Sequence, residues 1–215
     1  GFEYWSEYIG GFLGFVAYLI EKITVQLPDK IISISDHTLN NLKDMLKRVD
    51  NVYLVHIGNE IDYNSLVKSK IDSDVLFVGR LLKNKNVDIL IHSIKILKNN
   101  YPDIKLIIIG EGPEKNKLEK LSNDIGLEDN IKFINFLDNH DDVYSIMKSS
   151  KVFALPSSRE GFGIVVVESN ACGLPVVTVD SKNNASQYLI ENGVNGLVCS
   201  LSEDSLANSI KDLLS

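Results

Sequence analysis

Short, continuously apolar runs recur along this chain, and segments with helical periodicity separate them. The middles of four runs read Val-Leu-Phe-Val, Leu-Ile-Ile-Ile, Val-Phe-Ala-Leu and Val-Val-Thr-Val. Strands that are covered on both faces have this character, because a parallel sheet buries both of its sides. Strands that alternate with helices predict an α/β fold with a Rossmann-like, doubly wound parallel sheet.

The expected elements follow from these runs and from the turn residues between them. Strands are predicted at residues 30–35, 52–56, 74–79, 104–110, 131–135, 151–155, 175–179 and 196–199. Helices are predicted at residues 37–48, 87–99, 114–125, 141–149, 164–172, 185–191 and 203–213. Right-handed crossovers place the ligands of such a sheet at the carboxyl ends of its strands.

The turn Gly58-Asn59-Glu60 is the best candidate for a domain boundary. Residues 1–57 contain two helical pieces and only two predicted strands, which is too little for an independent sheet. We therefore expect residues 1–57 to be the tail of a preceding, incomplete domain. Residues 58–215 are expected to form the Rossmann-like domain.

Composition excludes some classes of partner. The 215 residues carry a formal net charge of −7 and include no long run of Lys or Arg, which argues against binding to nucleic acid. The two cysteines, Cys172 and Cys199, are too few for a disulfide framework and fit no metal-ligand spacing. We expect a reducing, cytoplasmic compartment, a thiol in the core at Cys172, and neither a metal nor a cofactor.

The segment from Ile9 to Ile20 is almost wholly apolar. It is too short to span a bilayer, which takes about 20 residues, and it lacks the basic leader and cleavage site of a signal peptide. Two interpretations remain open. The segment is either a helix buried against a sheet or a peripheral contact with a membrane surface.

A basic segment at residues 79–86 follows the strand predicted at residues 74–79. Gly79 ends that strand, Arg80 emerges at the edge where ligands bind, and Lys85 precedes the next helix. A forked guanidinium together with an ammonium can grip a diphosphate. The alternative is an ordinary solvated loop.

The stretch at residues 156–176 carries the strongest functional signal. Gly161-Phe162-Gly163 runs into an apolar helix that starts at Ile164 and Val165. Glycines let backbone N–H groups approach a ligand closely, and a helix start favours negative charge. A phosphate site is predicted here. The alternative is an ordinary glycine turn, which would have the same sequence pattern.

Two carboxylates flank this helix start. Glu160 precedes it, and Glu168 follows after seven intervening residues, inside a helix with little solvated surface. Glu168 could accept hydrogen bonds from a ribose diol, and Glu160 could hold the reacting sugar. A surface acid is the alternative for Glu168, but a charge beside so many valines needs a partner. Phosphates and hydroxyls together indicate a nucleotide sugar.

These motifs together resemble glycosyltransferase family 4. The resemblance rests on Gly-Arg-Leu followed by Lys85-Asn86, on Gly-Glu-Gly-Pro, and on Pro-Ser-Ser-x-Glu-Gly-Phe-Gly with Glu168 and Ala-x-Gly-x-Pro-Val-Val. It covers about residues 30–213. Members are retaining enzymes with two Rossmann-like domains, the GT-B fold. The resemblance implies transfer of a hexosyl group from a UDP- or GDP-sugar to a hydroxyl of a glycan or lipid-linked acceptor.

The resemblance also implies roles for particular residues. The candidate catalytic residues are Arg80 and Lys85 on the donor diphosphate and Glu160 on the donor sugar. Glu168 would bind the ribose hydroxyls, and the backbone at Leu137 would contact the base. The further candidate substrate-binding residues are Gly79, Gly161, Phe162, Gly163, Ile164 and Val165. No histidine is assigned a role: His37, His56, His92 and His140 are interpreted as core or surface residues.

Two departures from the family pattern matter. Asn59-Glu60-Ile61-Asp62 replaces the usual Asn-Gly-x-Asp hinge. The acceptor site of the family lies in the amino-terminal domain, so this chain is expected to be mainly the donor-binding half and inactive alone.

A non-catalytic nucleotide-sugar-binding module is the alternative function. A dinucleotide-dependent oxidoreductase is disfavoured, because Gly-x-Gly-x-x-Gly and its downstream acid are missing.

Overall fold

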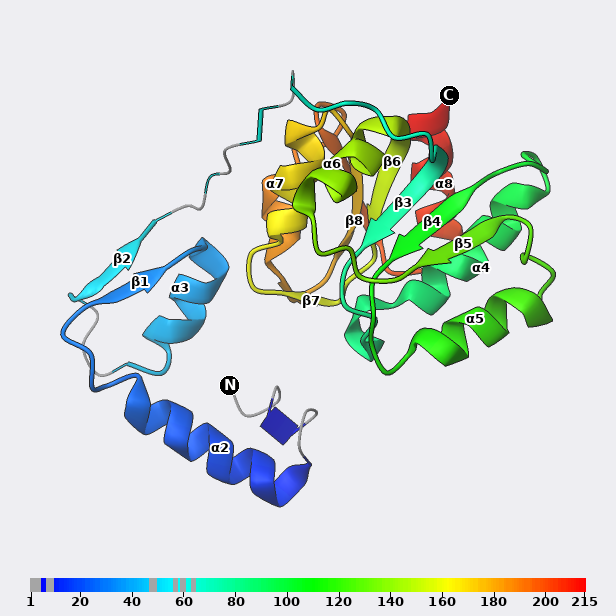
Figure 1. The fold of residues 1–215 in the computed structure, drawn as a ribbon. Helices are drawn as coiled ribbons and strands as arrows, with labels where there is room; N and C mark the ends of the chain where they lie inside the picture. Colours follow the sequence, from blue (N-terminus) through cyan, green and yellow to red (C-terminus); the bar gives the residue numbers. More distant parts are fainter. Residues whose placement is uncertain (1–4, 7–9, 47–49, 56–57, 59–60, 63–64) are drawn as a thin grey trace. The chain divides into compact units, whose positions relative to one another are not determined.

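The computed structural model describes residues 5–6, 10–46, 50–55, 58, 61–62 and 65–215 (Figure 1). The chain divides into two compact units, Gly1–Ile57 and Gly58–Ser215. The division falls at the turn that the sequence marks as a boundary. That the first unit is the tail of an acceptor domain stays a prediction, and the hinge residues Asn59 and Glu60, like His56, lie outside the described residues.

The second unit contains a six-stranded, wholly parallel sheet, which confirms the predicted α/β class. The strands lie in the order β10-β8-β6-β3-β4-β5. Their bounds are β3 Ser73–Val78, β4 Leu106–Ile109, β5 Ile131–Ile134, β6 Ser150–Leu155, β8 Val176–Asp180 and β10 Gly196–Ser200. Each predicted strand of this unit is present, within about two residues of its predicted ends.

Helices cover both faces of the sheet, as Figure 1 shows. Helices α4, α5 and α8 lie on one face, and α6 and α7 pack together on the other. Their bounds are α4 Val87–Lys98, α5 Lys115–Asp124, α6 His140–Ser149, α7 Ile164–Ala171 and α8 Glu203–Leu214. The described residues of the unit also form two 3₁₀ helices, η1 Lys83–Lys85 and η2 Ala185–Leu189, and a short parallel pair, β7 Arg159–Glu160 with β9 Asn183–Asn184.

The prediction of an α-helix at residues 185–191 is wrong, because the structure has the 3₁₀ helix η2 there. Its first turn is fixed by polar side chains. Asn184 accepts hydrogen bonds from the backbone N–H and the hydroxyl of Ser186, and the Ser186 hydroxyl also contacts that of Thr178. Such local bonds compete with the α-helical pattern and favour a tighter, shorter turn.

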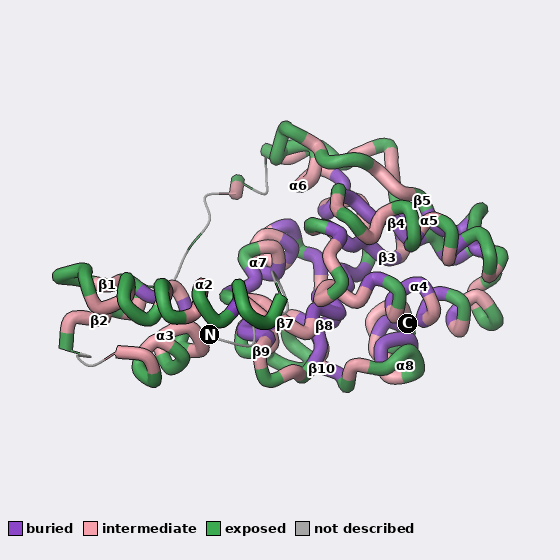
Figure 2. Tube along the Cα trace, turned by 90° about the horizontal axis from the view of Figure 1, so that it is seen from below, coloured by how far each residue is buried: buried purple, intermediate pink, exposed green. Residues whose placement is uncertain are grey.

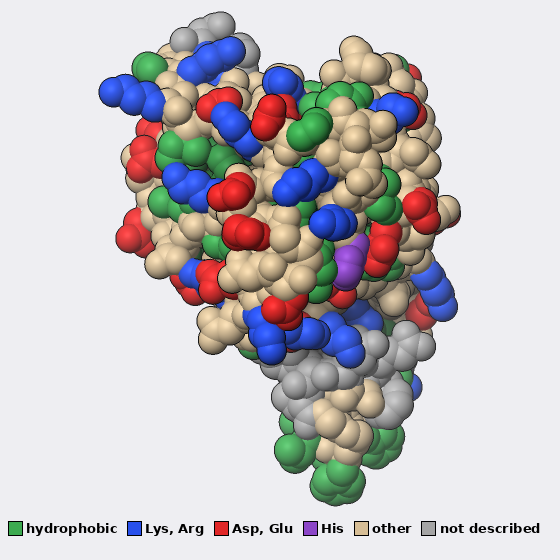
Figure 3. All heavy atoms as spheres, turned by 90° about the vertical axis from the view of Figure 1, so that its right-hand side faces the viewer, with side chains coloured by type: hydrophobic (Ala, Val, Ile, Leu, Met, Phe, Trp, Pro, Cys, Tyr) green, Lys and Arg blue, Asp and Glu red, His purple; other side chains and the backbone are tan. Residues whose placement is uncertain are grey.

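The core lies between the central strands and the helices, where Figure 2 shows the buried residues. Leu76, Phe77 and Phe153 are fully buried on the two central strands. Helix α4 contributes the predicted apolar stripe of Leu90, Ile91, Ile94 and Leu97. Each such side chain stabilises the fold by roughly 1.5–3 kcal/mol relative to an exposed one. On the face shown in Figure 3, acidic and basic side chains are interspersed.

The first unit contains α2 Gly11–Thr24, α3 Asp36–Lys43 and a two-stranded parallel sheet of β1 Ile31–Ser33 and β2 Val52–Leu54. Helix α2 is not buried against a sheet, which corrects that interpretation of the apolar segment. Phe12 is 80% exposed, Leu13 61% and Ile23 63%. Two strands of three residues offer too small a face to cover a helix of fourteen.

No described helix combines the length and the hydropathy needed to cross a membrane. A peripheral membrane contact through Ile9 to Ile20 stays a prediction, and Ile9 itself lies outside the described residues.

Candidate functional site

The sheet reverses its winding direction between β3 and β6. From β3 the chain moves outward through β4 and β5, then returns to the other side of β3 and continues through β6, β8 and β10. In open α/β sheets, ligands bind outside the carboxyl ends of the strands at such a switch point. The two motif segments, residues 79–86 and 156–163, directly follow these two neighbouring strands.

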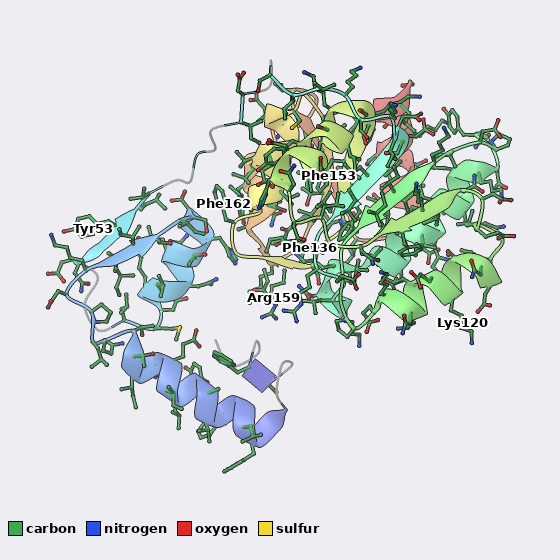
Figure 4. All side chains as sticks on the ribbon, in the orientation of Figure 1. Tyr53, Lys120, Phe136, Phe153, Arg159 and Phe162 are labelled. Atoms are coloured by element: carbon green, nitrogen blue, oxygen red, sulfur yellow. The ribbon has the colours of Figure 1, made fainter. Side chains whose placement is uncertain are left out.

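Hydrogen bonds join the two segments. The backbone N–H of Ser158 donates to the carbonyl of Asn84 at 2.9 Å. The side-chain amide of Asn86 donates to the carbonyl of Pro156 at 2.8 Å, and that of Asn84 donates to the carbonyl of Arg159 at 3.4 Å. Two stretches far apart in the sequence therefore form one continuous surface. Figure 4 labels Phe136, which follows β5, and Arg159 and Phe162, which follow β6.

The basic segment is also held from its other side. The N–H of Leu81 donates to the carbonyl of Glu111 at 2.8 Å, so the turn after β4 supports the loop after β3. A side chain at Gly110 would place its Cβ 2.0 Å from the carbonyl oxygen of Gly79. Only glycine permits this close approach, which explains the Gly-Glu-Gly-Pro turn and keeps Arg80 at the edge of the sheet.

Lys85 and Glu160 form an ion pair across the two segments. The Nζ atom of Lys85 donates to Oε1 of Glu160 at 2.5 Å, and the two side chains are only 16% and 13% exposed. Low exposure reduces screening by water and strengthens the attraction. The sequence predicts that both residues face a ligand, but it gives no sign that they contact each other.

The glycine loop passes into α7 in the predicted way. Gly163 is the N-cap residue and has a φ of 92°, in the left-handed region. A Cβ there would lie 2.5 Å from that of Ser186. No described side chain caps this helix start, and Phe162 is buried while Ile164 is 39% exposed. The backbone can therefore present its first N–H groups to an anion.

A cavity of about 380 Å³ opens at the same edge of the sheet. Among its lining residues are four of the predicted site residues, namely Gly79, Arg80, Leu137 and Glu168. Arg80 and Glu168 thus face one cavity, although they follow different strands. The ion pair and the glycine loop are outside the lining of this cavity but belong to the segments described above.

The cavity also has an aromatic and apolar wall that the sequence analysis missed. Phe136, His140, Val143 and Tyr144 line it, from the loop after β5 and from helix α6. The rings of His140 and Tyr144 lie 6.0 Å apart, one helical turn from each other. His140 is exposed, in line with its interpretation as a core or surface residue, and it also lines this cavity. His140 and Tyr144 are four positions apart, so on a helix they lie on the same face, and this spacing was the signal in the sequence for an aromatic wall.

Tyr144 contacts Glu168, the residue predicted to bind the ribose. Its hydroxyl donates to Oε1 of Glu168 at 3.1 Å. Burial, and then the negative charge of Glu168, raise the pKa of Tyr144 to about 12. The phenol is therefore a protonated donor at neutral pH. Glu168, which a reading of the sequence alone left without a partner, has one here.

The two cysteines take no part in the site. Both cysteines are free and buried, and burial followed by the charge of Glu168 raises the pKa of Cys172 to about 11. The thiol is thus an unreactive part of the core, as expected. Among the residues that the structure describes, no cluster of three or more His, Cys, Asp or Glu could hold a metal ion.

Comparison with known proteins identifies a family whose match covers the second unit. Residues 58–215 match the family described as Glycosyl transferases group 1. The matched range coincides with the second compact unit.

Individual relatives carry related descriptions. The chain is 30% identical over 197 residues to an uncharacterized glycosyltransferase of Haemophilus influenzae, covering 91% of this chain and 54% of that protein. It is 32% identical over 203 residues to N-acetylgalactosamine-N,N'-diacetylbacillosaminyl-diphospho-undecaprenol 4-alpha-N-acetylgalactosaminyltransferase of Campylobacter jejuni, covering 93% and 53%. The chain therefore spans about half the length of these curated relatives.

A solved structure confirms the fold. The complex of Anabaena HepE with UDP-glucose superposes with a TM-score of 0.74 at 24% identity, over 87% of this chain and 54% of that one. At this identity the likeness concerns the architecture alone, which is that of GT-B glycosyltransferases.

Proposed function

Because this chain belongs to the family of glycosyl transferases group 1, we propose that it is mainly the donor-binding half of a retaining glycosyltransferase. The complete enzyme would move a hexosyl group from a nucleoside diphosphate sugar to a hydroxyl acceptor. One observation carries the proposal: cations, a helix start and two carboxylates converge at the switch point of the sheet. That set of groups matches a ligand with phosphates in the middle and sugars at both ends.

The chemistry of each group supports a distinct task. The diphosphate gains negative charge as the bond to the sugar breaks. Arg80, Lys85 and the start of α7 at Gly163 would stabilise that charge as preorganised donors, and removal of one such donor costs about 10²–10³ in rate. Glu168 would bind the ribose hydroxyls, and Glu160 would hold the donor sugar. The leaving phosphate would act as the base in a front-face displacement.

The ion pair between Lys85 and Glu160 is compatible with phosphate binding by Lys85. An ammonium carries three N–H donors, and the bond to Glu160 uses one of them. Lys85 can therefore keep Glu160 in place and still donate to a phosphate. Glu160 likewise has a second carboxylate oxygen for a sugar hydroxyl.

The aromatic wall supports a place for the base. Phe136 is 66% exposed at the cavity and offers its ring for stacking. We propose a UDP- or GDP-sugar as donor, without a metal or cofactor. HepE was solved with UDP-glucose, and the Campylobacter relative is named for transfer to a diphospho-undecaprenol-linked saccharide. A glycan or lipid-linked acceptor, met in the cytoplasm or at its membrane face, is proposed accordingly.

A nucleotide-sugar-binding module without transfer activity is the second candidate. Every proposed site residue lies within the single unit Gly58–Ser215. Donor binding thus needs only this unit, whereas transfer needs an acceptor site as well. Isothermal titration with turnover assays separates the two, because a module would bind a nucleoside diphosphate yet neither transfer nor hydrolyse its sugar.

A thermal-shift panel of UDP-, GDP- and ADP-sugars tests the proposal on the 215-residue chain. A ligand at one hundred times its Kd stabilises the folded state by about 2.7 kcal/mol, which for a chain of this size raises Tm by about 5–10 °C. We expect this shift for one base. NAD is the matched control, and a shift with NAD alone would contradict the proposal.

A further inference from the structure

The hydrogen bond between Tyr144 and Glu168 joins two helices that the sequence alone does not connect. Tyr144 lies on α6 and Glu168 on α7, and both line the cavity at the switch point. The bond runs from the phenol hydroxyl to Oε1 at 3.1 Å. The Tyr144 ring also packs against the core, so its position is fixed independently of this bond.

A carboxylate without such a partner would be free to turn. The last torsion of a glutamate is broad, so both oxygens sample many orientations unless a neighbour holds them. An ionised carboxylate offers about four acceptor positions on its two oxygens. Tyr144 occupies one of these on Oε1, which restricts the rotation and leaves the others for a ligand.

Tyr144 is suited to this task because it stays protonated. Burial and the neighbouring charge raise its pKa to about 12, so the hydroxyl donates at any physiological pH. Glu168 is half-buried, so an acceptor position that a bound ligand shields from water without pairing is costly.

We infer that Tyr144 is a positioning residue, which holds Glu168 so that its remaining acceptor positions receive both hydroxyls of a ribose and select against 2′-deoxyribose. The inference rests on the proposed function. A site built to bind a hydroxyl rejects a ligand that lacks it, because the acceptor is then left without a partner. A carboxylate held by Tyr144 cannot turn away to another partner, so the penalty is retained.

Removal of the hydroxyl separates this role from packing. Tyr144→Phe keeps the ring against the core and His140 but removes the donor. The freed carboxylate then binds the diol less well and tolerates its loss better. We expect about three- to tenfold weaker binding of the ribonucleoside diphosphate, the range for one hydrogen bond. Binding of the 2′-deoxy analogue should change by less than about twofold.

The experiment is isothermal titration of the 215-residue chain with UDP or GDP, whichever binds, and with its 2′-deoxy form. The quantity measured is the Kd of the 2′-deoxy form divided by the Kd of the ribonucleotide, so a ratio above one means a preference for ribose. Tyr144→Phe and Tyr144→Leu both lack the hydroxyl and should both lower the ratio. Tyr101→Phe is the matched control, because Tyr101 follows α4 and lines a different cavity, together with Asp72 and Lys105. Its ratio should equal that of the wild type.

Each outcome decides between claims. Equal losses for both ligands, or an unchanged ratio in the folded Tyr144 variants, would overturn the positioning role while the proposed function stands. A wild type without preference for ribose would overturn both the inference and the ribose assignment of Glu168. Failure of the wild type to bind any nucleoside diphosphate would overturn the proposed function itself.

Discussion

Lys85 and Glu160 lie 75 positions apart in the sequence, yet their charged atoms are 2.5 Å apart. The pair joins the loop after β3 to the loop after β6, the two strands that flank the switch point. Each residue thereby keeps a partner for its charge in a place that excludes most solvent. The two proposed ligand-binding segments are thus also the segments that stabilise each other.

Breaking this ion pair should lower the stability of the chain. Lys85→Met leaves the Glu160 charge without its partner, and Glu160→Gln does the reverse. Because both side chains retain some exposure, we expect a coupling free energy of about 1–2 kcal/mol, less than for a fully buried pair. Urea unfolding of both single variants and the double variant measures it, and additive losses would contradict the interaction.

Arg80→Ala should affect diphosphates selectively. The guanidinium is exposed and free to form two parallel bonds to phosphate oxygens. We expect a loss of about tenfold or more for UDP or GDP, with little change for the free nucleoside. Lys105→Ala removes an exposed cation before β4, at the other end of the strands, and serves as control. Equal losses for nucleoside and diphosphate would argue against a phosphate grip.

Glu168→Ala should weaken the nucleotide through its ribose. Charge-assisted hydrogen bonds contribute about 1.5–3 kcal/mol, so the Kd should rise by roughly ten- to a hundredfold. Circular dichroism establishes that the variant is folded, and calorimetry gives the affinity. An unchanged affinity in the folded variant would rule out the ribose role.

Gly163→Ala should destabilise the loop that begins α7. The left-handed φ of 92° disfavours any side chain, and the new Cβ would collide with Ser186. Together these effects should cost about 2–4 kcal/mol. Gly161→Ala is the control, because a Cβ there meets nothing within 4 Å, and it should cost less than about 1 kcal/mol. Equal effects of the two substitutions would contradict this account of the loop.

The pKa of Tyr144 predicts a loss of stability in alkali. Its folded value of about 12 lies above the ordinary 10.0, so between these pH values the unfolded chain releases a proton that the folded chain keeps. This group therefore leaves the free energy of unfolding unchanged below pH 10 and lowers it as the pH rises to 12. Urea titrations of the wild type and Tyr144→Phe should show a steeper decline for the wild type, and parallel declines would be inconsistent with the shifted pKa.

The fold was predictable because its signals are local. The apolar run at 75–78 and the turn Gly110-Glu111-Gly112-Pro113 mark strand and helix ends without reference to the rest of the chain. The site was predictable in part, since loops after neighbouring parallel strands must meet at one edge. Four predicted residues, including Arg80 and Glu168, do line one cavity.

The remainder depends on distances between elements, which no local pattern encodes. The contact of Tyr144 with Glu168 requires the packing of α6 on α7. The pairing of Lys85 with Glu160 requires the adjacency of β3 and β6. The apolarity of α2 resembles that of a buried helix, yet several of its large apolar side chains are exposed.

A crystal structure of the 215-residue chain with bound UDP or GDP tests the central claim most directly. The account predicts the diphosphate between Arg80, Lys85 and the first N–H groups of α7, with the ribose hydroxyls on Glu168. Nucleotide density at the opposite edge of the sheet, in the cavity beside Asp72 and Lys105, or with the phosphates away from Arg80, would contradict it.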